Sequence, residues 1–85
     1  MLPVMRPDVA KDMEGVIADL EDLCRSIKNI GLARRQYAVP SMLTANDKMV
    51  VCSAVRSALK PHSVMVSANH LRTDGGPNLV VTVRR

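Results

Sequence analysis

Residues 9–30, VAKDMEGVIADLEDLCRSIKNI, decide how this chain folds. Their apolar residues recur at alternating intervals of four and three, which is the heptad register of an α-helix with one buried face. Further small or apolar residues beside this seam make the face broader than that of a two-stranded coiled coil. We therefore predict a helix that packs against more than one neighbour. The seam consists of Val9, Met13, Val16, Leu20, Leu23, Ile27 and Ile30, widened by Ala10, Ile17, Cys24 and Gly31.

Residues at the ends of two segments predict where helices begin and end. Pro7 suits the first helical position and Gly31 suits a left-handed cap, so the first helix is expected over residues 7–31. Thr44 followed by Asp47 resembles a capping box, and Pro61 prevents a helix from continuing, so a second helix is expected over residues 44–60. Residues 32–43 are predicted to be a connector. A short strand over residues 36–39, at a sheet edge because of Pro40, is the less favoured alternative.

The C-terminal segment, residues 63–85, is predicted to form a β-hairpin. Asp74-Gly75 is typical of a two-residue hairpin turn that requires positive φ angles. An alternative with a longer loop from His70 to Asn78, leaving Pro77 outside the ladder, stays open. The expected register pairs Thr73 with Gly76, His70 with Leu79, Ala68 with Val81 and Val66 with Val83, and on the other face Asn69 with Val80, Ser67 with Thr82 and Met65 with Arg84.

These elements predict an α+β fold over a single small domain, residues 1–85, in the order helix, connector, helix, β-hairpin. Both helices should pack on one face of a small antiparallel sheet. Tyr37 is the only aromatic residue, so the core must come from smaller apolar side chains. The broad faces of both helices exceed what a two-stranded hairpin can cover. We therefore expect self-association, as a dimer, through the first helix.

The net charge of +4 is unevenly distributed along the chain. Residues 1–32 hold four basic and six acidic side chains, whereas residues 33–85 hold eight basic and two acidic ones. A basic second half suits an anionic partner, and a charge match within or between copies explains it equally well. The candidate contacts to an anion or a nucleic acid are Arg34, Arg35, Arg56, Lys60, Arg84 and Arg85.

Catalytic, cofactor and metal sites are not expected. Cys24, Cys52, His62 and His70 lack the spacing of paired metal ligands. Cys24 and Cys52 lie on apolar helix faces, where a free thiol behaves as a small hydrophobic side chain. A redox switch through these two cysteines is a remote alternative. Nothing beside His62 and Ser63 provides an acid to orient the histidine, so the protein is not expected to be an enzyme.

The remaining patterns favour a cytoplasmic protein that interacts with other proteins. The sequence has no predicted signal peptide and no apolar run long enough to span a membrane. We expect an accessory or regulatory module that self-associates and docks on a larger protein, a size class that includes phage-encoded proteins. A strand edge of the hairpin also remains available for strand addition. The alternative is a nucleic-acid-associated basic module.

Overall fold

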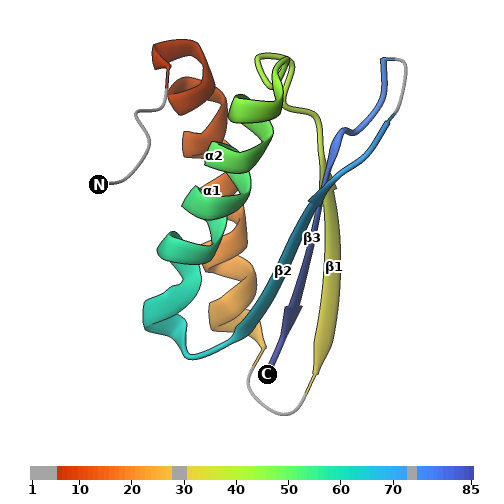
Figure 1. Cartoon of the computed structure of the whole chain (residues 1–85). Coiled ribbons are helices and arrows are strands. Elements are labelled where there is room, and N and C mark those ends of the chain that lie inside the picture. Colours follow the sequence, from red (N-terminus) through yellow and green to blue (C-terminus); the bar gives the residue numbers. More distant parts are fainter. Residues whose placement is uncertain (1–5, 28–30, 73–74) are drawn as a thin grey trace.

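The computed structural model describes residues 6–27, 31–72 and 75–85 of the chain. Helix α1 (Pro7–Ser26) is followed by strand β1 (Leu32–Tyr37) and helix α2 (Ala45–Leu59). A short 3₁₀ helix, η1 (Lys60–His62), leads into strands β2 (Met65–His70) and β3 (Leu79–Arg84). The sheet lies on one side of the molecule, and both helices pack against the same face of it (Figure 1). The predicted α+β fold with both helices on one face is confirmed.

The sheet contains a third strand that the sequence analysis placed in the connector. Strand β1 spans Leu32–Tyr37. It begins four residues earlier than the short strand considered over residues 36–39 and overlaps it at residues 36 and 37. It pairs antiparallel with β3, which therefore lies between β1 and β2. Since β1 and β2 both run antiparallel to β3, they run parallel to each other and are joined through α2. This arrangement is a split β-α-β unit with β1 and β2 as its edges.

The predicted hairpin register is confirmed throughout β2 and β3. Val66 pairs with Val83, Ala68 with Val81 and His70 with Leu79. The amide of Leu71 donates to the carbonyl of Asn78 at 2.8 Å, which continues the same register toward the turn. Gly75 has a φ of 74°, the positive value that the turn requires. The predicted pairing of Thr73 with Gly76 lies outside the described residues.

Helix α1 is shorter than predicted. It ends at Ser26, because Ile27 already has an extended backbone (φ −81°, ψ 97°) and the chain turns there toward β1. The heptad pattern marks a buried face, and it contains no signal for the point at which the backbone leaves the helix. The predicted cap at Gly31 was therefore wrong, and Ile30 lies outside the described residues.

The start of α2 matches the predicted capping box. The Thr44 side chain accepts a hydrogen bond from the amide of Asp47, and Asp47 accepts one from the amide of Thr44. Asp47 is only 4% exposed, and Arg6 forms a bidentate pair with it at 3.1 and 2.7 Å. Arg6 also donates to the Ser41 carbonyl at 2.8 Å. These contacts join the start of α1 to the start of α2.

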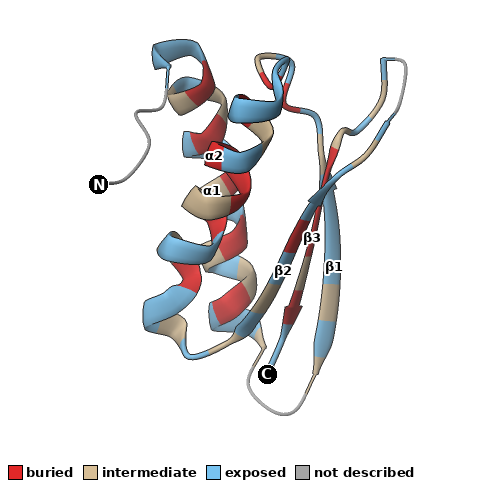
Figure 2. Cartoon of the chain, in the orientation of Figure 1, coloured by how far each residue is buried: buried red, intermediate tan, exposed pale blue. Residues whose placement is uncertain are grey.

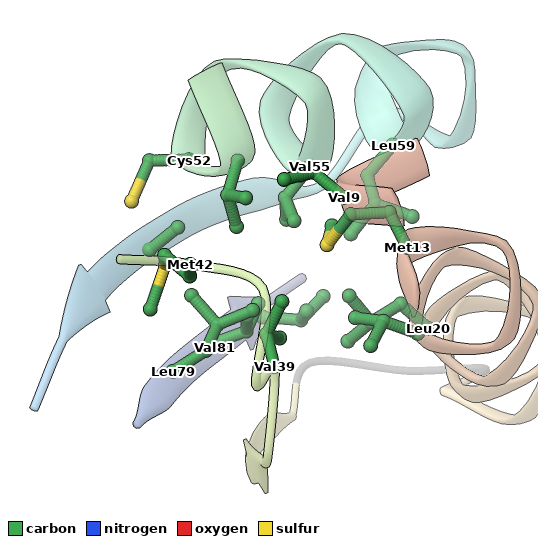
Figure 3. Packing of buried hydrophobic residues seen from close by; sticks show 14 of the residues in the cluster. Val9, Met13, Leu20, Val39, Met42, Cys52, Val55, Leu59, Leu79 and Val81 are labelled. Carbon is green, nitrogen blue, oxygen red and sulfur yellow. The ribbon is translucent and has the colours of Figure 1, made fainter. Parts of the chain in front are cut away.

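The hydrophobic core lies between the two helices and the inner face of the sheet. Figure 2 shows buried residues on the sheet-facing sides of α1 and α2 and along the central strand β3. In Figure 3, Leu79 and Val81 of β3 lie opposite Val55 and Leu59 of α2, with Leu20 of α1 beside them. Aliphatic and sulfur-containing side chains make up the buried cluster, as the near absence of aromatic residues predicted, and Tyr37 is partly buried against it. The largest fully buried side chains are Met13, Leu20, Leu59, Leu79, Val9, Val39, Val51, Val55, Val81, Val83 and Cys24.

Candidate functional site: a groove beside the free edge of β2

Most of the α1 residues that were predicted to form an interface are buried or partly buried within the single chain. Val9, Met13, Val16 and Leu20 are buried in the core. Leu23 and Ile27 of the seam, and Ile17 beside it, are partly buried and pack against the core. The third strand supplies the cover that a two-stranded hairpin would have lacked. The apolar face of α1 is therefore mostly covered within the chain.

Among the described residues, the exposed large apolar side chains lie on the sheet, on α2 and in the loop before α2. Leu32 and Met65 are 69% and 70% exposed, and each is paired across the sheet with Arg84. They lie on the outer face of the sheet, away from the helices. Met49 of α2 is 60% exposed and borders the edge of β2. Leu43, in the loop before α2, is the fourth such residue.

The six basic residues proposed as anion contacts are distributed over separate surfaces. Alternation along the strands places Arg34 and Arg84 on the outer face of the sheet and Arg35 on the opposite face. Arg85 donates to the carbonyls of His62 and Cys24 at 3.1 and 3.4 Å, so it holds the C-terminal strand to the ends of the helices. Arg56 and Lys60 line one hollow, and Arg34 and Arg84 are diagonal neighbours on the outer face of the sheet, because Arg34 pairs with Thr82.

The outer edge of β2 exposes backbone hydrogen-bonding groups. Odd-numbered residues of β2 point their amides and carbonyls toward β3, as the bond from Leu71 to Asn78 shows. Because these directions alternate along an antiparallel strand, Val66, Ala68 and His70 point theirs away from the sheet. Within the described parts of the chain, no strand pairs with this edge. The edge therefore presents donors and acceptors suited to a further strand.

Helix α2 runs antiparallel to β2 and forms the wall of a groove along this edge. One stripe at spacings of three and four faces the groove, namely Ala45, Met49, Cys52 and Arg56 of α2 and Lys60 at the start of η1. A hollow of about 310 Å³ lies at one end, lined by Ala45, Lys48, Met49, Cys52 and His70. A second hollow of about 320 Å³ lies at the other end, lined by Arg56, Ser57, Lys60, Val64 and Val66. We call this surface the β2 groove.

Arg56 crosses the middle of the β2 groove. Its Nη2 atom donates to the carbonyl oxygen of Ala68 at 3.5 Å, a long hydrogen bond to an outward-pointing edge carbonyl. No carboxylate forms an ion pair with Arg56 or Lys60 among residues 6–27, 31–72 and 75–85. The groove therefore has a mainly apolar end, which also contains Lys48 and is called the apolar end below, and a basic end that contains Arg56 and Lys60.

Sequence reasoning identified only part of this site. Arg56 and Lys60, four residues apart on the exposed strip of a predicted helix, were nominated as anion contacts. Met49 and His70 were not, because their proximity depends on the helix packing antiparallel to an edge strand. The free strand edge was anticipated in general terms, without the third strand, which covers the other side of β3 and leaves β1 and β2 as the two edges of the sheet.

The histidine and cysteine side chains do not gather into a metal site within the described ranges. No cluster of three or more His, Cys, Asp or Glu side chains there could hold a metal ion. The Nε2 atom of His62, in η1, lies 3.7 Å from the Oε2 atom of Glu21, and this pair is away from the β2 groove. Cys24 and Cys52 are free and buried, as predicted. Burial raises the pKa of both thiols, which disfavours the reactive thiolate.

Comparison with known proteins finds no matching family model, no matching curated protein and no matching solved structure.

Proposed function

We propose that this chain is a non-enzymatic protein-interaction module that binds an extended segment of a partner protein along the β2 groove. The segment would add to the sheet as a fourth strand beside β2. The observation that carries the proposal is the combination of an open strand edge with a helix wall and a hollow at each end. Main-chain bonds to an edge strand supply affinity in this binding mode, and pockets for alternate side chains supply specificity.

The two edges of the sheet differ in a way that favours β2. Strand β1 carries Arg34 and Arg35, and charged side chains on an edge strand oppose pairing with a further strand. Strand β2, with the sequence MVSANH, contains no Lys, Arg, Asp or Glu. Its protection comes from Arg56, which belongs to another element and can move away without disturbing the sheet.

A nucleic-acid function has weaker support from the same geometry. The candidate basic residues lie on separate surfaces rather than in one stripe that could follow a phosphate backbone. The lone aromatic side chain, Tyr37, donates to Asp19 of α1 at 2.5 Å and belongs to the inner side of the sheet. It is therefore not placed to stack on exposed bases.

In the parts of the chain that the structure describes, no helix is both long and apolar enough to cross a bilayer.

Selection from a random peptide library displayed on yeast tests the proposal. We expect enrichment of peptides that bind the wild-type chain and shift the amide resonances of Val66, Ala68 and His70. A Val66→Pro variant, which removes one outward donor and no bond to β3, should lose these peptides. Arg34→Gln on the opposite edge is the matched control and should keep them. Enrichment of no peptide, or of peptides that bind Val66→Pro equally well, would contradict strand addition at β2.

A further inference from the structure

We infer, resting on the proposed function, that the β2 groove selects a segment with an acidic side chain four residues after an apolar one. The acidic side chain lies over Arg56 and Lys60, and the apolar side chain lies over Met49 and Cys52. The segment runs antiparallel to β2.

The basic end of the groove is suited to a carboxylate. Arg56 and Lys60 line the same hollow, and Ser57 adds a hydroxyl group to it. Neither cation has an acidic partner in the described ranges, so the hollow has an uncompensated positive charge. A guanidinium binds a carboxylate through two parallel hydrogen bonds, and these charge-assisted bonds are among the stronger ones in proteins. Charge complementarity therefore favours Asp or Glu at this end.

The opposite end of the groove is suited to an aliphatic side chain. Ala45, Met49 and Cys52 line the hollow together with Lys48 and His70. Met49 is flexible and largely exposed, which lets it close over an inserted side chain. Burying a Leu or Ile there removes apolar surface of both partners from water. The apolar end therefore supplies affinity, and the basic end supplies selection.

The geometry of the strand fixes the spacing between the two side chains. The basic hollow lies beside Val66 and the apolar hollow beside His70, four residues further along β2. Side chains of an added strand alternate between faces, so positions opposite Val66, Ala68 and His70 all point toward α2. Antiparallel pairing is somewhat more stable per residue than parallel pairing. The N-terminal part of the segment then lies beside His70, and its acidic residue follows the apolar one by four positions.

Arg56 connects the addition of a strand at the β2 edge to the recognition of the acidic side chain of that strand. In the free chain it occupies the Ala68 carbonyl through a bond of 3.5 Å. An added strand donates a backbone amide to that carbonyl and displaces the guanidinium. Arg56 is then free to pair with the carboxylate in its own hollow. Arg56 thus covers the β2 edge when no segment is bound and contacts the segment when one is bound.

Synthetic peptides test this motif directly. The probe is acetyl-Thr-Ile-Thr-Ala-Thr-Glu-Thr-amide with a fluorescent label, and binding is measured by fluorescence anisotropy. Replacing Glu by Gln should weaken binding to the wild-type chain by about tenfold or more. The double variant Arg56→Gln, Lys60→Gln should bind the Glu and Gln peptides equally. Arg84→Gln, which removes an exposed charge from the outer sheet face, is the control and should keep the preference for Glu.

Two further peptides separate this inference from the proposed function. Methylating the backbone nitrogen of the central Ala should abolish binding, whereas methylating that of the Thr after it should not, because only the former faces β2. Equal binding of the Glu and Gln peptides, with this pattern of methyl sensitivity retained, would overturn the acidic motif and leave strand addition standing. Library peptides that bind β2 without the motif would overturn it in the same way. Protection of the β2 amides by self-association before peptide is added would overturn both, since a second copy would then be the occupant.

Discussion

Arg56 of α2 donates to the carbonyl oxygen of Ala68 on the outer edge of β2, across 3.5 Å. An arginine side chain from a neighbouring helix thus occupies a backbone acceptor that would otherwise be open to a further strand. Natural sheets commonly protect their edges with charged side chains. Here the protecting charge is on a different element from the strand, and the contact is long. We propose that this contact opens when a further strand binds, whereas the charged side chains of β1 belong to the strand itself.

Leu20 tests whether α1 serves the core of the single chain. It is fully buried, so Leu20→Ala should lower the free energy of unfolding by about 2–5 kcal/mol. Glu14→Ala, on the exposed side of the same helix, should change it by no more than about 0.5 kcal/mol. Urea unfolding measures both. A wild-type stability that rises steeply with protein concentration would instead place the seam in an interface between copies.

Asp47 should make stability depend on pH in the acid range. The Arg6 guanidinium, followed by the amide of Thr44, holds the pKa of this carboxyl well below its usual range. Its contribution is therefore fully present above the unfolded value of about 3.9 and is lost as the pH falls through the lowered value. The gap in Tm between the wild type and Asp47→Asn should be widest near neutral pH and should close in acid. Asp22→Asn, at an exposed ion pair, should show a small gap at every pH.

Tyr37 should make stability depend on pH in the alkaline range. Burial, followed by its hydrogen bond to Asp19, raises the pKa of the hydroxyl above its usual value. Its contribution is present below about pH 10 and is lost as the pH rises toward the raised value. Because it is the only tyrosine, the absorbance of tyrosinate reports on it alone. Asp19→Asn should move this titration to lower pH, and an unchanged titration would contradict the pairing.

The two thiols should react slowly in the folded chain. Burial raises the pKa of Cys24 and of Cys52, so both should label with a thiol reagent much faster after denaturation. Cys52 also lines the apolar end of the β2 groove. A bound peptide should therefore slow its labelling and leave that of Cys24 unchanged. Rapid labelling of both thiols in the native chain would contradict this packing.

Local patterns predicted much of the fold. Asp74-Gly75 as the turn, supported by alternating side chains in Met65–His70 and Leu79–Arg84, predicted the register of β2 and β3, and Thr44 with Asp47 marked the start of α2. Strand β1 was missed because its alternation is interrupted. Arg35 occupies an inner-face position between Ala33 and Tyr37, at an edge that the helices leave partly uncovered. Its pairing depends on β3, more than forty residues later, which a local pattern does not reveal.

The β2 groove was less predictable because it is a tertiary feature. Met49 and His70 form one hollow only when α2 packs antiparallel to β2, and neither residue has a distinctive neighbour in the sequence. Arg56 and Lys60 were visible as a basic pair, but their meaning changes once Val64 and Val66 lie beside them. In the sequence, Arg56 and Lys60 are typical of an exposed strip of a helix, whereas in the structure they form the basic end of the β2 groove.

Amide hydrogen exchange with a library-selected peptide tests strand addition at β2 most directly. The outward amides of Val66, Ala68 and His70 should exchange rapidly in the free chain and at least about tenfold more slowly when the peptide is bound. The outward amides of Leu32, Arg34 and Gln36 on β1 should be unaffected. Protection at β1, or bound peptide with no protection at the three β2 amides, would contradict the account.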